Sequence, residues 1–291
     1  KEVAFLYRGD VYVSGVDGGG TKRITTTPEA ETGVEFSPDG KALVYASERG
    51  GRWAIYEARR ARDAEPYFFA STIVRETPLV DNDRQNTHPS WSPDGKALAY
   101  LEDRNTLRVL DLATRRTRTL LTERELFGND HHFQWSPDGR WILFDLDVPG
   151  IAPTEVGLVR ADGTGSVVNL TQSGFNDARP RWILGGKAMM WFSNRDGLRA
   201  AAQSGGTQQD AYAMFFDREA WERFRLSKEE YALVKEGEER AAKQRADSTR
   251  AAADSAARRP VAPLALDLDG ADLRRARLTV ASASMSDALV S

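Results

Sequence analysis

The sequence predicts an all-β protein, a β-propeller of four-stranded antiparallel blades, on three observations. The tetrapeptide Ser-Pro-Asp-Gly occurs three times, at residues 37–40, 92–95 and 136–139. An aromatic residue precedes each copy, and an apolar strand-like run follows it. Strand-like runs recur in groups of four with a period of roughly 40 to 50 residues, which is typical of a propeller blade.

The tetrapeptide has the composition of a turn between two strands. Ser suits the first position of a type I turn, Pro presets φ at the second, and Gly takes the last. This glycine can also adopt a positive φ and form the bulge that is common in short hairpin loops. The preceding aromatic residues, Phe36, Trp91 and Trp135, occur once per blade, which favours packing between adjacent sheets over a stacking platform for a ligand.

The predicted strands fall into about five whole or partial blades. The first blade has runs at 3–6, 10–13 and 22–25, and the second begins near Gly33. The clearest blade has runs at 87–91, 97–101, 106–112 and 118–121, and the next has runs at 131–135, 142–144, 155–159 and 167–170. The last has runs at 179–182, 189–192 and 211–216, with its turn reduced to Ile183-Leu184-Gly185-Gly186.

The repeat is irregular in its first two blades. The first five residues align with the run that follows each Ser-Pro-Asp-Gly, so we expect an N-terminally truncated propeller whose sequence begins just after an earlier copy of the turn. The second blade is longer than the others, and we assign the excess, residues 59–86, to an insertion with a strand-like run from Glu65 to Val74.

The repeat ends before Asp217, which gives three predicted domains: a propeller at 1–216, a helical, charged linker at 217–263, and the start of a further domain, a second propeller, at 264–291. Asp217 can cap a short helix, and Ser227 opens a capping box for a second helix with Tyr231 and Val234 inward. Beyond Gly237 the composition predicts a solvated helix or a flexible linker. The last domain shows strand-like runs at 264–268 and 277–280.

Composition excludes several classes of function. The chain has 40 basic and 43 acidic residues and a net charge of -3, so it lacks the basic field that nucleic-acid binding requires. It has no cysteine, which removes disulfides, thiolate nucleophiles and Cys-based zinc sites. It has no run of about 18 apolar residues, so we expect no membrane span.

Four motifs have the residue types of a binding site, and each has a structural interpretation that we favour. Residues Gly15 to Lys22 suggest a phosphate loop, but the spacing is wrong, and the equivalent 161–165 indicates a hairpin turn in both blades. The histidines His88, His131 and His132 precede the first strands of their blades and could form a ring on one face. No ligand spacing supports a metal there, and ordinary hydrogen bonding is favoured.

Two acidic pairs, Asp81-Asn82-Asp83 and Asp145-Leu146-Asp147, lack the glycine and the glutamate of a calcium loop, which favours solvated loop acids. No Gly-x-Ser-x-Gly elbow is present. We therefore predict no catalytic, cofactor-binding or metal-ligating residue and no cofactor. Tyr67, Phe68 and Phe69 lie outside the repeat and are the better candidates for a partner-facing patch, although strand alternation would bury at least one of them.

The repeat resembles the propeller repeats of TolB and of tricorn-type serine peptidases. Several stretches are similar to the N-terminal propeller of bacterial tricorn homologues. They are Ala46-Ser47-Glu48-Arg49 with Ile55-Tyr56-Glu57, Glu155-Val156-Gly157-Leu158 with Asn169-Leu170-Thr171-Gln172-Ser173-Gly174, Ser193-Asn194-Arg195-Asp196-Gly197, and Asp210-Ala211-Tyr212-Ala213-Met214-Phe215-Phe216 with Ala220-Trp221-Glu222-Arg223-Phe224. The resemblance covers nearly the whole chain, and the tail from Leu266 resembles the entry to a second propeller.

This resemblance implies a propeller that admits or guides peptides or unfolded protein toward a peptidase domain of the same parent protein, beyond a PDZ-like module. It carries no catalytic residue onto this sequence, and it implies a periplasmic or secreted location, with a cytoplasmic one as the alternative. A TolB-like scaffold that binds envelope proteins without enzymatic activity is the second hypothesis. The propeller of a prolyl-oligopeptidase-type hydrolase is the third.

Overall fold

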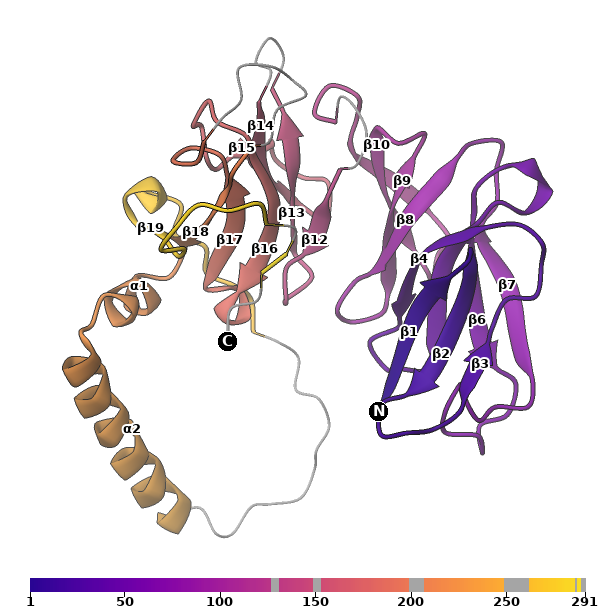
Figure 1. Cartoon of the computed structure of the whole chain (residues 1–291), viewed down its shortest axis with the longest axis horizontal. Coiled ribbons are helices and arrows are strands. Elements are labelled where there is room, and N and C mark those ends of the chain that lie inside the picture. Colours follow the sequence, from indigo (N-terminus) through magenta and orange to yellow (C-terminus); the bar gives the residue numbers. More distant parts are fainter. Residues whose placement is uncertain (127–130, 149–152, 199–206, 249–261, 286, 289–291) are drawn as a thin grey trace. The chain divides into compact units, whose positions relative to one another are not determined.

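Five antiparallel sheets make up the β structure of the chain, as seen in the computed structural model (Figure 1). The structure describes all residues except 127–130, 149–152, 199–206, 249–261, 286 and 289–291. The first sheet has three strands and the other four have four strands each. This arrangement confirms the predicted fold class, blades of a β-propeller.

The strands follow one another along the chain, and neighbours in the sequence pair within each sheet. The first sheet contains β1 (Glu2–Tyr7), β2 (Asp10–Gly15) and β3 (Thr21–Arg23), and the second contains β4 (Glu31–Phe36), β5 (Ala42–Ser47), β6 (Ala54–Arg60) and β7 (Val74–Val80). The third contains β8 (Asn86–Trp91), β9 (Ala97–Glu102), β10 (Thr106–Asp111) and β11 (Thr117–Leu121). The fourth contains β12 (Phe133–Trp135), β13 (Trp141–Asp147), β14 (Thr154–Arg160) and β15 (Val168–Asn169). The fifth contains β16 (Asp177–Ile183), β17 (Ala188–Ser193), β18 (Asp210–Phe215) and β19 (Arg275–Arg277).

Each Ser-Pro-Asp-Gly forms the same turn between the first two strands of its sheet. In the second sheet the Ser37 hydroxyl donates to Asp39 at 2.6 Å and accepts from the Ala42 N–H at 2.9 Å, and Gly40 has a φ of +69°. The copies at Ser92 and Ser136 repeat these hydrogen bonds. The positive φ at the last position explains why glycine stands there. The prediction of a turn that joins two strands is thus confirmed.

The fifth sheet takes its last strand from the tail of the chain. Strand β19 pairs antiparallel with β18, and the Ala213 residue of β18 lies opposite Ala276. The sequence placed residues 264–291 in a further domain, with strands at 264–268 and 277–280. The structure instead shows no strand at 264–268, and residues 275–277 complete the sheet that β16 to β18 begin.

The chain divides into two compact units, residues 1–180 and 181–291. In the first unit, clusters of buried side chains lie between consecutive sheets: Val11 and Val13 pack with Leu43 and Tyr45. In the second unit, Phe215 and Ala213 pack against Trp221 and Leu278. The tail therefore belongs to the hydrophobic core of the second unit.

The insertion of the second sheet differs from its predicted form. The run from Glu65 to Val74 is irregular, and the fourth strand of the sheet is β7, which follows it. Within the loop Phe68 is fully buried and packs edge-on against Phe36, with ring centroids 5.9 Å apart. The loop also contacts the first sheet, because the Phe69 N–H donates to Glu2 at 3.1 Å.

Two helices follow β18, at the places that the sequence predicts. Asp217 caps α1 (Arg218–Phe224) by accepting from the Ala220 N–H at 2.7 Å. The capping box of α2 (Lys228–Ser248) forms between Ser227 and Glu230. The prediction that Tyr231 and Val234 point inward is wrong, since their exposed fractions are 44% and 40%. The rest of the predicted linker, residues 249–261, lies outside the described residues.

Candidate functional site

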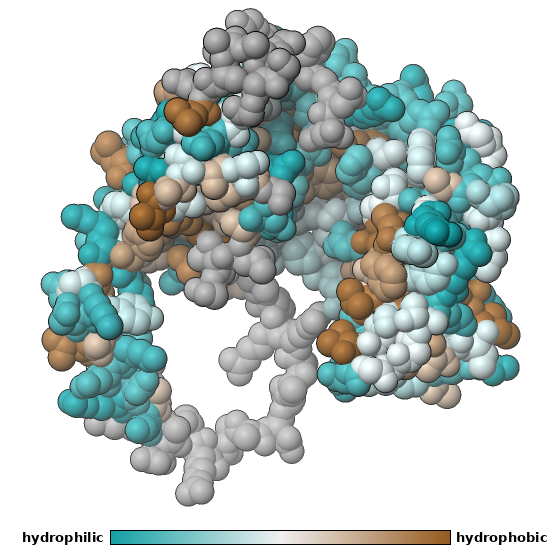
Figure 2. All heavy atoms as spheres, in the orientation of Figure 1, coloured by the Kyte–Doolittle hydropathy of each residue, from teal (hydrophilic) through white to brown (hydrophobic). Residues whose placement is uncertain are grey.

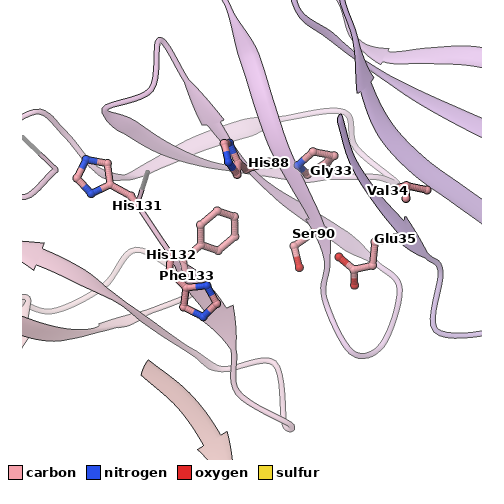
Figure 3. Close-up of a pocket in the computed structure, with 9 residues that line it drawn as sticks. Gly33, Val34, Glu35, His88, Ser90, His131, His132 and Phe133 are labelled. Atoms are coloured by element: carbon pink, nitrogen blue, oxygen red, sulfur yellow. The ribbon is translucent and has the colours of Figure 1, made fainter. Parts of the chain in front are cut away.

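A cavity of about 250 Å³ opens between the first strands of three consecutive sheets, β4, β8 and β12 (Figure 3). We call it the inner-strand cavity. Its lining combines one carboxylate, three imidazoles, a hydroxyl and apolar side chains. The residues are Gly33, Val34, Glu35, His88, Pro89, Ser90, His131, His132 and Phe133.

Bulges in β4 and β8 shape the wall of this cavity. The register of β4 against β5 shifts between Thr32 and Glu35, and that of β8 against β9 shifts between Thr87 and Ser90. The bulged residues are Gly33, with a φ of +67°, and His88, with a φ of +52°. A left-handed conformation at a residue other than glycine costs on the order of 1–3 kcal/mol. Arg179 has a φ of +56° at the equivalent position of β16, so this conformation recurs in the repeat. A bulge also redirects the side chain that it carries, here the imidazole of His88.

Glu35 is the carboxylate of the cavity, and its side chain is half-buried. Burial raises the pKa of Glu35 to about 7, although hydrogen bonds from the Ser90 hydroxyl and the Trp91 N–H oppose that rise. Figure 3 shows the Glu35 carboxylate and the Ser90 hydroxyl directed toward the same space. A carboxyl group with a pKa near neutrality can accept or donate a hydrogen bond at the cavity wall.

The three histidines line the same cavity, in agreement with the predicted placement on one face. Each ring has a separate nearby partner. His88 Nδ1 lies 3.1 Å from Thr87 Oγ1, His132 Nε2 lies 3.0 Å from the Pro180 carbonyl, and His131 Nε2 lies 3.8 Å from Asp147 Oδ2. Among the residues described by the structure, no group of three or more His, Cys, Asp or Glu could hold a metal ion.

Asp145 corrects the interpretation of the Asp145-Leu146-Asp147 pattern as solvated loop acids. It lies in β13, is 6% exposed, and accepts hydrogen bonds from the His132 N–H at 3.0 Å and the Arg179 N–H at 2.7 Å. Burial raises the pKa of Asp145 to about 6, and these two N–H groups partly offset that effect. Asp145 therefore fixes the backbone on which His132 is carried.

A second and larger cavity, of about 830 Å³, shares His88 with the first. It lies among the loops that join β5 to β6 and β9 to β10 and beside the start of β8. Its lining includes both charges and an aromatic ring, since Glu48, Arg104 and Trp53 contribute to it. The remaining residues of the lining are Thr32, Gly51, Gln85, Thr87, His88 and Leu101. The two cavities are thus adjacent at His88, and their linings combine apolar, polar and charged side chains.

The other patterns from the sequence contribute no residue to the lining of either cavity. Residues 15–22 include the hairpin turn between β2 and β3, where Gly18 has a φ of +86°, and the equivalent turn contains Gly163 with a φ of +78°. Both therefore form the predicted hairpins. Asp81 pairs with Arg52 at 3.0 Å, and Asn82 accepts from the Arg84 N–H at 3.0 Å.

The aromatic residues before the turns and those of the insertion have different surroundings. Trp91 and Trp135 are 4% and 7% exposed, which confirms their predicted place in the core. In the insertion Phe68 is buried, and Tyr67 stacks on Phe69 with ring centroids 5.3 Å apart. The Phe69 ring lies against Gly19, at a position where an added Cβ would come within 2.8 Å of it. Phe69 therefore covers the first sheet of its own chain.

Several residues of the site could not be identified from the sequence. Nothing in their local pattern indicates a site. Glu35 lies within a strand, Trp53 lies just before a strand, and Arg104 lies in a turn. The available signal was the alignment of the repeats, since Glu35 takes the place of Ser90, Gln134 and Arg181 in the other first strands. Glu35 is the one acidic residue among these four.

Comparison with known proteins identifies chains of similar sequence and similar fold. No family model matches the chain. The uncharacterized protein Atu1656 of Agrobacterium fabrum is 34% identical over 191 residues, which are 53% of this chain and 62% of that protein. The putative TolB from Agrobacterium tumefaciens has a TM-score of 0.54 at 22% identity, over 75% of this chain and 74% of the other. The tricorn protease has a TM-score of 0.60 at 13% identity, over 97% of this chain and 24% of the other.

These similarities establish a TolB-like β-propeller region. The identities to the solved structures are low, so they show the fold alone. The chain spans less than two thirds of the length of Atu1656. Within the part of the chain that the structure describes, no helix is both long and apolar enough to cross a membrane.

Proposed function

We propose that this chain is the non-catalytic propeller of a tricorn-like serine peptidase and that the inner-strand cavity guides peptide substrates toward a peptidase domain outside the chain. The observation that carries the proposal is the cavity itself, formed by three first strands and continued at His88 by a second cavity. The similarity to the tricorn protease over 97% of this chain supports the parent class.

The composition of the two linings suits an extended peptide. A peptide presents N–H donors and C=O acceptors at regular intervals, and side chains of every kind between them. Glu35 and Ser90 offer an acceptor and a donor, His88 offers either, and Trp53 offers an apolar surface. A site of this kind holds a chain without selecting one sequence, which suits a substrate guide.

Its partners in this proposal are unfolded protein or peptide, a downstream propeller, and PDZ-like and peptidase domains of the same parent. The location that accords with it is periplasmic or secreted, as the resemblance to exported proteins of this class implies. The chain performs no chemistry of its own in this account, so substrate passes through it unchanged.

A TolB-like binding scaffold for envelope proteins is the second candidate, and the similarity to a putative TolB over 75% of the chain favours it. Both candidates use the same cavities, but they differ in what the parent protein contains. The coding sequence beyond Ser291 separates them: PDZ-like and peptidase domains support the first, and a stop codon supports the second.

The test of the proposed site is the binding of a fluorescently labelled, unfolded peptide of about 20 residues, measured by anisotropy. Glu35→Gln replaces a charged acceptor by a weaker, neutral one, and His88→Ala removes the imidazole, so each should weaken binding at pH 8 by about tenfold. Glu123→Gln is the matched control, because Glu123 is an exposed glutamate outside both cavities. Equal binding by all three variants would rule out this site.

A further inference from the structure

Four buried acidic side chains of the sheets each pair with an arginine. They are Glu31 with Arg49 at 3.9 Å, Glu57 with Arg59 at 2.7 Å, Glu102 with Arg108 at 2.6 Å, and Asp210 with Arg277 at 2.7 Å. A cation beside a carboxylate offsets part of the cost of removing that charge from water. These pairs show how the fold compensates an acid that it buries.

Glu35 has no arginine, lysine or histidine at ion-pair distance within the part of the chain that the structure describes. Its hydrogen-bond partners are the Ser90 hydroxyl and the Trp91 N–H, and its raised pKa reflects burial with no neighbouring charge. The carboxylate instead faces the inner-strand cavity, as Figure 3 shows. A cationic group of a ligand would therefore give Glu35 the countercharge that arginines give the other acids.

The inner-strand cavity has room for one side chain of a peptide. Its volume of about 250 Å³ lies below the roughly 300–1,000 Å³ of a site for a whole small molecule. Val34, Pro89 and Phe133 give it apolar walls, along which the methylene groups of a lysine side chain can lie. The ammonium group has N–H donors only, and the Glu35 carboxylate and the Ser90 hydroxyl oxygen can both accept from it.

We propose that the inner-strand cavity selects a lysine side chain of the guided peptide, whose ammonium group pairs with Glu35. This inference rests on the proposed peptide-guiding function and adds the residue that the peptide presents at this point. Lysine is favoured over arginine, because a guanidinium uses two parallel hydrogen bonds to a carboxylate, and Ser90 and Trp91 already occupy part of the Glu35 acceptor positions. Lysine is a common residue, so this requirement still admits most unfolded sequences.

The ion pair couples peptide binding to the proton of Glu35. Only the ionised carboxylate attracts an ammonium group, and a pKa of about 7 leaves half of the Glu35 carboxyl groups protonated at pH 7. Binding should therefore release about half a proton per peptide at pH 7, and the affinity should rise about tenfold between pH 6 and pH 8. The facing imidazoles of His88, His131 and His132 also repel a cation when protonated, so a variant that keeps them must isolate the contribution of Glu35.

The probe is a pair of short, labelled peptides with one central lysine or one central acetyl-lysine among glycine, serine and threonine, blocked at both ends. Acetylation removes the charge of the side chain, so the difference in affinity between the two peptides measures the ion pair. Figure 2 shows hydrophobic side chains at the surface where β1 and β2 lie in Figure 1, and Val3, Phe5, Leu6 and Tyr7 are 37–55% exposed. A probe without large apolar residues avoids adsorption to that surface.

The lysine peptide should bind the full 291-residue chain about tenfold more tightly than the acetyl-lysine peptide at pH 8, measured by fluorescence anisotropy. Glu35→Gln should remove this preference and most of the pH dependence, whereas Glu123→Gln, at an exposed glutamate, should keep both. Ser90→Ala should shift the pH dependence to higher pH, because the Ser90 hydroxyl lowers the Glu35 pKa. Calorimetry in buffers of different ionisation enthalpy should show proton release at pH 7 and almost none at pH 9.

The peptides also separate this inference from the proposed function. Equal affinities of the natural chain for the lysine and acetyl-lysine peptides would overturn the inference and leave the guiding function standing. Absence of saturable binding of either peptide up to ~1 mM would overturn both. Tighter binding of an arginine peptide, or of an uncharged peptide with a free amino terminus, would overturn the assignment of the ligand as a lysine side chain.

Discussion

Arg277 binds Asp210 through two guanidinium nitrogens, Nε at 3.0 Å and Nη2 at 2.7 Å, and so joins β19 to β18 across 67 positions of sequence. Asp210 is fully buried and also accepts from Thr279 Oγ1 at 2.6 Å and Ser282 Oγ at 2.7 Å. Burial by itself raises the pKa of Asp210, and these hydrogen bonds outweigh it, so the pKa lies below its usual value. The pair therefore fixes the tail to the fifth sheet.

Arg277→Ala should lower Tm by about 4 °C or more, since it leaves a buried carboxylate without its cation. The pKa of Asp210 is lowered in the folded state, so its stabilisation is present above the unfolded pKa and is lost as the pH falls through the folded value. The difference in Tm between the natural chain and Arg277→Ala should thus shrink at acidic pH. Arg116→Ala, at an exposed arginine, is the control for calorimetry. An unchanged Tm would show that the tail is held by other contacts.

Ser92→Ala should destabilise the chain by about 1–2 kcal/mol in urea unfolding. The Ser92 hydroxyl is buried and accepts the Ala97 N–H at 2.9 Å, and removal of an acceptor from a buried donor costs that amount. Ser166→Ala, at an exposed serine outside the turns, should change the free energy of unfolding by less than about 0.5 kcal/mol. Equal effects of the two variants would contradict a structural role for the repeated turn.

Phe144→Ala should cost about 3–5 kcal/mol, the usual loss for a fully buried aromatic ring. Phe5→Ala removes the same ring at the equivalent position of the first sheet and should cost about 1 kcal/mol, because Phe5 is 37% exposed. The comparison holds the residue type and the repeat position constant. Comparable losses in chemical denaturation would mean that the face of β1 is already covered in solution.

Glu35 should make stability depend on pH in the neutral range. Its pKa is raised to about 7 in the folded state by burial, so its favourable contribution is complete below pH 4.5 and is lost as the pH rises through 7. Glu35→Gln should match the natural chain at pH 5 and exceed it at pH 8 by up to about 3 kcal/mol. Unfolding curves at the two pH values measure this, with Glu123→Gln as the control. A pH-independent difference would place the Glu35 pKa near its ordinary value.

The sequence could predict what local chemistry determines. Local patterns determine the three turns, the helix caps at Asp217 and Ser227, and most strands. The residues that form each of these features lie within a few positions of each other, so the sequence alone indicates them. The four-strand period then indicates the blades. We expected at least one of Tyr67, Phe68 and Phe69 to be buried, and Phe68 is, although these residues do not form a strand.

Contacts between distant segments account for what the sequence could not predict. Strand β19 has three residues and an unremarkable composition, and it is a strand because β18 lies beside it. Asp145 resembled a solvated acid because its partners, the N–H groups of His132 and Arg179, carry no side-chain signature. Glu35 became part of a site only when β4, β8 and β12 were brought together around one cavity.

The most direct test of the central claim, that the chain guides peptides without cleaving them, is photo-crosslinking of an unfolded peptide followed by mass spectrometry. The account predicts adducts on the residues of the two cavities that share His88, weakened in Glu35→Gln, and recovery of all unlinked peptide at its intact mass. Adducts confined to other surfaces, or cleaved peptide produced by the purified chain, would contradict it.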